Sequence, residues 1–219
     1  RLAGVALDEL LAEARARGEL PVGAIGRRAL EELVEEVEPI VEAAEAELAA
    51  PARDPIEVDL PLETPAGPAR LVGRLRRVRA SGLVGAEFVR LKENQRLRLW
   101  IEHLTLSAVA APGVPARSVL VARSRDSSSR DAARVVFEHA IESSRERLAE
   151  LVGAYLDAER RPLAFDPDAS AAYVAAQRSG GGEAAALASA RKTWTSNRYR
   201  DAHLAELLLP GGEIVPPAP

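Results

Sequence analysis

Acidic residues on neighbouring strands are the first feature of this sequence that could carry chemistry. Metal-dependent DNA cleavage requires carboxylates that converge on Mg²⁺, with a lysine nearby to assist the attacking water. A strand aspartate, followed one strand later by an acidic residue and a lysine two positions on, would supply them. Here residues 73–77 carry arginine where the aspartate is needed, and Glu87 is followed by Val89 instead of lysine. The sequence therefore predicts a nuclease-like hairpin that has lost its chemistry, with no catalytic residue, metal or cofactor.

An active Mg²⁺-dependent nuclease is the alternative interpretation of the same hairpin. Its metal ligands would be Asp59 and Glu87, and its lysine would have to be Lys92, which lies well beyond Glu87 along the strand. Metal-dependent cleavage that is lost on Glu87→Gln would favour this alternative.

Other catalytic arrangements find no support in the sequence. There is no cysteine, and His103, His139 and His203 lie far apart, without the spacing of a helical metal site. His103 follows Glu102 directly, and adjacent helical side chains point about 100° apart, so we expect a packed, hydrogen-bonded histidine. Neither a GxSxG motif nor a Walker loop occurs, and residues 180–182 (Gly-Gly-Gly) indicate a flexible hinge.

Charge is distributed very unevenly along the chain. Residues 29–65 hold twelve Asp and Glu against one Arg, whereas residues 70–98 hold nine Lys and Arg against two Glu. The acidic helix predicted at residues 31–47 is interpreted as a solvated or docking face. Basic side chains on the arginine-rich hairpin would contact phosphate without reading sequence. The predicted DNA-binding residues are Arg70, Arg74, Arg76, Arg77, Arg79, Arg90 and Lys92.

Apolar periodicity predicts helices first and then a small sheet. Helices are expected at 2–17 and 27–49, with Pro39 kinking or dividing the second. Strands at 56–60, 70–79 and 83–91 would form a meander, the last two being the arginine-rich hairpin. An amphipathic helix at 94–110 follows, and the apolar segment 118–121 would add a strand to the same sheet.

The rest of the chain is expected to be helical. Asp131 would cap a helix beginning at about Ala132 and running to Arg160, with a break near 142–145. Further helices are expected at 169–177, 183–194 and 199–209. The predicted fold is α+β (α/β-like), a small mixed sheet flanked by helices. We expect an N-terminal helical segment at 1–50, the α/β core at 51–178, and C-terminal helices with a tail at 179–219.

Composition narrows the cellular setting. The absence of cysteine is compatible with a reducing cytoplasm, and no apolar run is long enough to span a membrane. Because the chain begins within a predicted helix and without Met, we interpret it as a fragment of a longer protein.

Four motifs in order resemble the RecC C-terminal domain family. Residues 97–104 (LRLWIEHL) resemble the family's LxLWLEHL helix, and residues 88–92 (FVRLK) resemble the segment that precedes it. Residues 20–26 (LPVGAIG) are similar to its LPxGxxG turn. Residues 190–194 (ARKTW), followed by Tyr199, resemble its closing region, although the interval from Trp194 to Tyr199 is shorter than in the family pattern.

The resemblance implies a fold related to PD-(D/E)xK nucleases without their catalytic residues. It implies a place in RecBCD (exodeoxyribonuclease V), a helicase–nuclease that processes double-strand ends for recombinational repair. The expected partners are the RecB (beta) subunit, with RecD (alpha) as a further candidate, and a double-stranded DNA end or fork. The domain would guide or split the duplex and dock the partner subunit. A purely structural interaction domain, whose arginines pair with a partner's carboxylates, stays open as a third interpretation.

Overall fold

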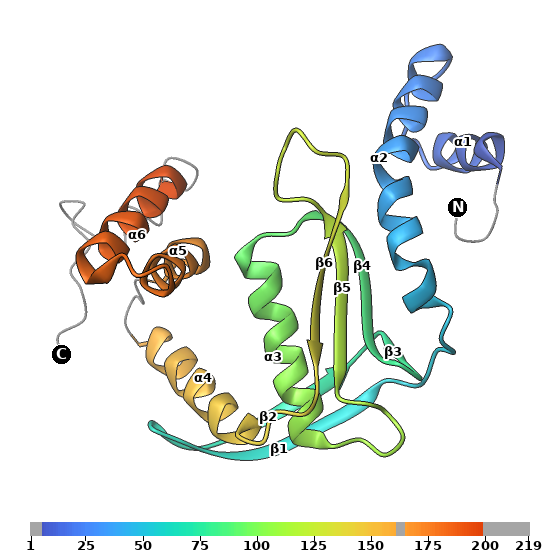
Figure 1. Ribbon diagram of the computed structural model, residues 1–219. Coiled ribbons are helices and arrows are strands. Elements are labelled where there is room, and N and C mark those ends of the chain that lie inside the picture. Colours follow the sequence, from blue (N-terminus) through green and yellow to red (C-terminus); the bar gives the residue numbers. More distant parts are fainter. Residues whose placement is uncertain (1–5, 161–164, 199–219) are drawn as a thin grey trace. The chain divides into compact units, whose positions relative to one another are not determined.

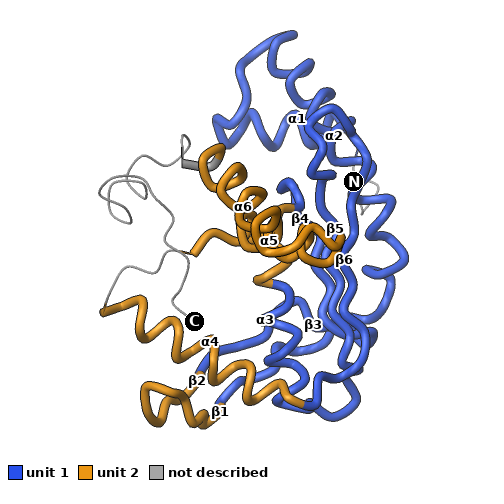
Figure 2. The backbone as a smooth tube through the Cα atoms, turned by 60° about the vertical axis from the view of Figure 1, so that its left-hand side comes forward, with its two compact units in different colours: residues 1–59, 72–91, 99–142 blue, residues 60–71, 92–98, 143–219 orange. Residues whose placement is uncertain are grey.

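The computed structural model of this protein describes residues 6–160 and 165–198. The described part holds six helices, a two-stranded sheet and a four-stranded mixed sheet (Figure 1), so the expected α+β class is confirmed. The chain divides into two compact units made of interleaved segments (Figure 2). The first unit comprises residues 1–59, 72–91 and 99–142, and the second comprises residues 60–71, 92–98 and 143–219.

The four-stranded sheet belongs to the first unit. Its order is β3 (Val78–Arg79), β4 (Gly82–Arg90), β5 (Arg117–Arg123) and β6 (Ala132–Glu138). The central strands β4 and β5 are parallel, and the outer pairings are antiparallel. Parallel neighbours need a long crossover connection, and α3 (Glu93–Val109) supplies it. The helix expected at 94–110 and the strand expected at 118–121 are thereby confirmed.

Strand β5 is buried on both faces. On one face Leu120 and Ala122 pack with Leu91 and with Leu99 of α3. On the other face Val119 and Val121 pack against the long helix α2 (Ala24–Leu48) through Ile40 and Ala44. Helices α2 and α3 therefore cover opposite faces of the sheet.

Helix α2 is continuous through Pro39, so the expectation that this proline divides it is wrong. Helix α1 (Leu7–Ala16) precedes α2 and is joined to it by a turn in which Gly18 and Gly23 adopt positive φ angles of 71° and 76°. These are conformations that glycine adopts without steric cost.

The helix expected from Ala132 is wrong, because residues 132–138 form strand β6. Ala133, Val135 and Phe137 alternate with Arg134 and Val136, and their pairing with β5 runs without interruption from Arg123↔Ala132 to Arg117↔Glu138. Cross-strand pairing therefore outweighs the capping signal of Asp131. The helix itself begins later, as α4 (Ser144–Ala158).

The three-stranded meander is also wrong. Strands β1 (Ile56–Thr64) and β2 (Gly67–Leu75) form a separate two-stranded sheet. After β2 the chain turns at Arg77, whose φ is 61°, and β3 enters the larger sheet beside β4. The return strand expected at 83–91 is present as β4. Of the strand expected at 70–79, only residues 78–79 (β3) pair with it, and β2 does not.

The second unit contains a helical hairpin. Helices α5 (Pro167–Arg178) and α6 (Gly182–Arg198) pack against each other, and positive φ angles at Gly180 and Gly182 make the turn between them. The Asp166 carboxylate accepts a 2.6 Å hydrogen bond from the Ala169 N–H and caps α5, which contains the helix expected at 169–177. The helix expected at 199–209 lies outside the described residues.

Much of the acidic face of α2 is paired inside the first unit. The Glu47 carboxylate accepts from both terminal nitrogens of Arg117, at 2.6 and 2.8 Å, and also from Arg134. Glu36 pairs with Arg123 and Glu35 with Arg130. This helix is therefore not simply a solvated face, since its carboxylates tie it to the arginines of β5, β6 and their connection.

Glu47→Gln is expected to lower the free energy of unfolding by about 1–3 kcal/mol, because two arginines lose a carboxylate that is only 11% exposed. Hydrogen bonding from Arg117 holds the pKa of Glu47 below its ordinary value. The stability that Glu47 contributes is thus present at neutral pH and lost as the pH falls through the folded-state pKa. Urea unfolding followed by circular dichroism should show a wild-type advantage that shrinks in acid.

The matched control is Glu45→Gln, on the same helix but exposed. It should change the unfolding free energy by less than about 0.5 kcal/mol. Equal losses for the two variants would contradict the role of Glu47.

Candidate nucleic-acid interface

The structure does not gather the predicted DNA-binding residues on one hairpin. Arg70 and Arg74 lie on β2, Arg76 and Arg77 follow it, Arg79 is on β3, Arg90 ends β4, and Lys92 precedes α3. Arg70 and Lys92 belong to the second unit, and the other five belong to the first. Each cation therefore has to be judged by what its side chain contacts.

Arg79 is committed to the end of α2. One of its terminal nitrogens donates to the backbone oxygens of Leu48 and Ala50, at 2.6 and 2.7 Å. The last carbonyls of a helix lack intrahelical donors and carry partial negative charge, so a guanidinium satisfies both needs. This arginine fixes α2 to the edge of the sheet.

Arg77 bridges two carboxylates on the α3 side of the sheet. Nη1 donates to Glu87 Oε1 of β4 at 2.6 Å, and Nη2 donates to both oxygens of Glu102 of α3 at 2.8 Å. All three side chains are between 24% and 33% exposed. Charge-assisted bonds of this length in a half-buried place are among the stronger hydrogen bonds in proteins.

Gly85 makes room for this cluster. A Cβ built on Gly85 would lie 2.6 Å from Nη1 of Arg77 and 3.2 Å from the Leu120 side chain. Because Gly85 and Glu87 are two residues apart on β4, they share the face on which the guanidinium lies. Glycine at this position therefore allows the guanidinium to lie over the strand.

The cluster bears on the active-nuclease interpretation, in which Glu87 and Asp59 would bind Mg²⁺. Glu87, the ligand of the active-nuclease interpretation, faces a cation, and Asp59 lies on β1 in the other sheet. Lys92 follows the end of β4, as expected from its distance along the chain. No group of three or more potential metal ligands occurs within residues 6–160 and 165–198. These residues do not fit a Mg²⁺ site.

The cations left for an external phosphate are the exposed ones. Arg76 is exposed and forms no ion pair with any residue of the described part. Arg74 pairs with Glu57 at 2.6 Å, but both side chains are more than 60% exposed. A surface ion pair of this kind is worth little and exchanges readily for another anion. Arg90, half-buried, donates to the backbone oxygen of Asp126.

His103 is a packed histidine, as expected. Its ring is 1% exposed and stacks on Phe137, with centroids 5.6 Å apart. Nε2 donates to the backbone oxygen of His139, so that Nδ1 accepts from the Ser118 hydroxyl, both at 3.0 Å. Burial lowers the pKa of His103, which keeps the ring neutral. Its hydrogen bonds join α3 to β5 and leave no nitrogen for catalysis.

Sequence reasoning missed the arginines of β5 and β6. Arg117 and Arg123 frame the apolar strand, and Arg134 lies opposite Val121 on β6. Arg117, Val119, Val121 and Arg123 are every second residue of β5 and therefore share one face. This alternation was the signal available in the sequence. It pointed to a partner helix with apolar and acidic positions, and α2 is that helix.

A protein-family model of the RecC C-terminal domain matches residues 1–178. The chain belongs to the RecC C-terminal domain family. No curated protein matches the chain. The match covers the whole first unit, so the Arg77 cluster and the α2–sheet contacts are features of a RecC domain of RecBCD, which connects the chain with DNA repair and recombination. None of the described helices is both long and apolar enough to cross a membrane.

Arg77→Ala in this RecC domain is expected to lower the unfolding free energy by about 1–3 kcal/mol, since Glu87 and Glu102 would lose the guanidinium that bridges them. Arg77→Lys should recover only part of the loss, because an ammonium group lacks the planar fork that serves both carboxylates. Thermal unfolding of the three proteins at low and high salt measures this order. A variant series without any change in stability would show that the cluster is only a surface contact.

Proposed function

We propose that this domain is a non-catalytic part of the RecBCD helicase–nuclease that guides or splits duplex DNA ends and docks a partner subunit. The observation that carries the proposal is the Arg77 guanidinium between Glu87 and Glu102. A guanidinium at this position satisfies the carboxylates, whereas nuclease chemistry needs a divalent ion there to activate water.

The proposal includes a nuclease-like core of the PD-(D/E)xK kind. Its support is the arrangement of a mixed sheet with a β4–α3–β5 crossover and helices on both faces. The acidic position on β4 is retained as Glu87, and the position two residues later is Val89, which cannot assist a water molecule. The division into segments 1–50, 51–178 and 179–219 stays a prediction.

Exposed arginines after and along β2 are the proposed contacts to the DNA backbone. Arg76 and Arg74 have the exposure that a phosphate contact requires. For Arg70, Arg90 and Lys92 the assignment stays a prediction. The guanidinium groups of Arg77 and Arg79 contact other residues of this domain, so these two arginines are not among the proposed phosphate contacts.

Replacing Arg74 and Arg76 by Ala is expected to weaken binding of a forked duplex by the assembled RecBCD complex. The slope of log affinity against log salt should fall by about one for each arginine that contacts a phosphate. Fluorescence anisotropy with labelled DNA over a range of salt, in EDTA, measures both quantities. The control is Arg28→Ala, an 82% exposed arginine among the acids of α2, which should leave the salt slope unchanged. Equal slopes for all the proteins would overturn the DNA contact.

Glu87→Gln is expected to leave the nuclease rate of the assembled complex unchanged, because Glu87 pairs with Arg77 and holds no metal. The measurement is Mg²⁺-dependent degradation of linear duplex DNA, with assembly verified by gel filtration. A large loss of cleavage in a fully assembled complex would instead support the active-nuclease interpretation.

A further inference from the structure

The apolar stripe of α2 extends beyond the part that covers the sheet. Apolar residues recur along it at alternating spacings of four and three, the period of a coiled-coil seam: Leu30, Val34, Val37, Val41, Ala44 and Leu48. The C-terminal part packs on β5 through Ala44 and its neighbour Ile40. The N-terminal part of the stripe lines a different surface.

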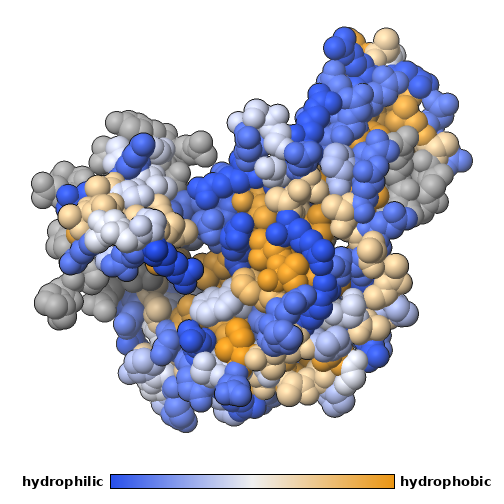
Figure 3. All heavy atoms as spheres, in the orientation of Figure 1, coloured by the Kyte–Doolittle hydropathy of each residue, from blue (hydrophilic) through white to orange (hydrophobic). Residues whose placement is uncertain are grey.

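That surface is an apolar groove between α1 and α2. It has a volume of about 600 Å³ and is lined by Leu7 and Leu10 of α1 and by the stripe of α2 from Leu30 to Val41. Leu33, which also lines it, is 44% exposed. Figure 3 shows hydrophobic surface in the angle between the two helices. Helix α1 thus covers only part of the seam.

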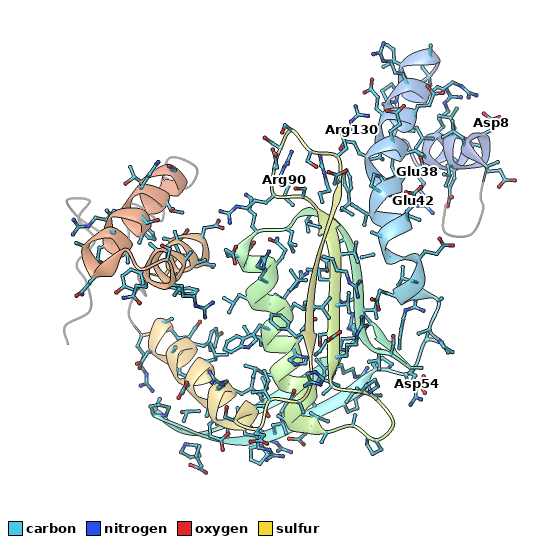
Figure 4. The ribbon with its side chains drawn as sticks, viewed as in Figure 1. Asp8, Glu38, Glu42, Asp54, Arg90 and Arg130 are labelled. Carbon is cyan, nitrogen blue, oxygen red and sulfur yellow. The ribbon has the colours of Figure 1, made fainter. Side chains whose placement is uncertain are left out.

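One rim of the groove is acidic. Glu31, Glu38 and Glu45 repeat every seven residues on the flank of the seam, and Glu42 lies beside them. Glu38 and Glu42 line the groove, and Figure 4 shows both on the side of α2 that faces α1. Within the described part of the chain, Glu42 and Glu45 form no ion pair, and Glu31 has only a distant contact of 3.9 Å with Arg27. Glu31, Glu42 and Glu45 differ in this respect from Glu35, Glu36 and Glu47, which form ion pairs with arginines of the sheet and its connections.

The charge of the rim selects the occupant. A nucleic-acid phosphate would be repelled by the carboxylates of Glu31, Glu42 and Glu45. A second copy of this chain would place the same acidic flank against itself, and like-charge contacts at an interface cost several kcal/mol. A helix with apolar residues at the seam spacing and Lys or Arg along one edge satisfies both the groove and the rim.

We infer that the α1–α2 groove docks an amphipathic, basic-edged helix of another subunit of the RecBCD complex. The inference rests on the docking part of the proposed function and is independent of the arginines proposed to contact DNA. Apolar side chains of the docked helix fill the groove beside Leu33 and Val37, and its basic edge pairs with Glu38 and Glu42.

The test places a photo-reactive benzoylphenylalanine at Leu33 of full-length RecC within the assembled complex. Irradiation should cross-link it to a second subunit, through a peptide that carries Lys or Arg at helical spacing, as identified by mass spectrometry. The position control is the same replacement at Val72, a 67% exposed valine of β2 outside the groove, which should give only background. A partly exposed residue is chosen so that the domain stays folded.

Charge reversal tests the rim. Glu38→Lys with Glu42→Lys should lower the cross-linking yield about tenfold, the effect of about 1.4 kcal/mol of binding energy. Glu32→Lys, whose parent side chain is 62% exposed and pairs with Arg28, should leave the yield unchanged. Cross-links only to the same polypeptide, to a second RecC copy, or at the Val72 background would overturn the inference. If DNA binding still depends on Arg74 and Arg76 in that case, the groove assignment fails while the DNA-handling proposal stands.

Discussion

Strand β5 has no solvent face, and most of the first unit follows from that constraint. Val119, Leu120, Val121 and Ala122 are completely buried. Each buried aliphatic side chain of this size stabilises the fold by roughly 1.5–3 kcal/mol, but only if both faces are covered. Helix α2 covers one face and α3 the other, and the strands on either side are held in register by β5 itself. The order of the elements along the chain therefore matters less than the need for two helical layers.

Two arginine–carboxylate clusters join these layers, one on each side. On the α2 side, the carboxylate of Glu47 receives the arginines of β5 and β6. On the α3 side the arrangement is reversed, because one guanidinium, that of Arg77, donates to two carboxylates. Each group is only partly exposed, so the removal of one partner leaves charge in a poorly solvated place. The uneven charge of the sequence thus reflects pairing inside the fold as well as surfaces for partners.

The sequence predicted the parts of the fold that depend on local patterns. The period of α3 and the apolar run of β5 each gave the correct element, and the helix expected at 169–177 is present within α5. The errors concern long-range contacts. Residues 132–138 are a strand because β5 pairs with them. The chain turns at Arg77, which has a positive φ, between β2 of the small sheet and β3 of the large sheet. Neither feature can be inferred from the adjacent residues, and the partners of Glu47 lie 70 and 87 residues away in the chain.

At the candidate site, the sequence indicated which residues depart from the nuclease pattern but not what the arginines contact. Arginine in the segment before β4 and valine after Glu87 were visible directly. That one of several arginines lies over Gly85 and reaches Glu102 required the geometry of the sheet. The sequence did predict a packed, hydrogen-bonded His103, because adjacent helical side chains point in different directions. Hydrogen bonds at both ring nitrogens confirm this prediction.

Under the proposed function, a guanidinium stands where a nuclease would bind its metal ion, and the domain keeps its layers without the chemistry. Mg²⁺ requires a near-octahedral shell and retains waters that it can activate. Arg77 instead offers planar donors to the carboxylates of Glu87 and Glu102. The ion pairs of Arg77 hold β4 and α3 together, so the cluster contributes to stability. Under the proposed function, chemistry then belongs to another subunit. This domain contributes surfaces, with exposed arginines for phosphate and the acidic, apolar groove of α1 and α2 for a protein helix.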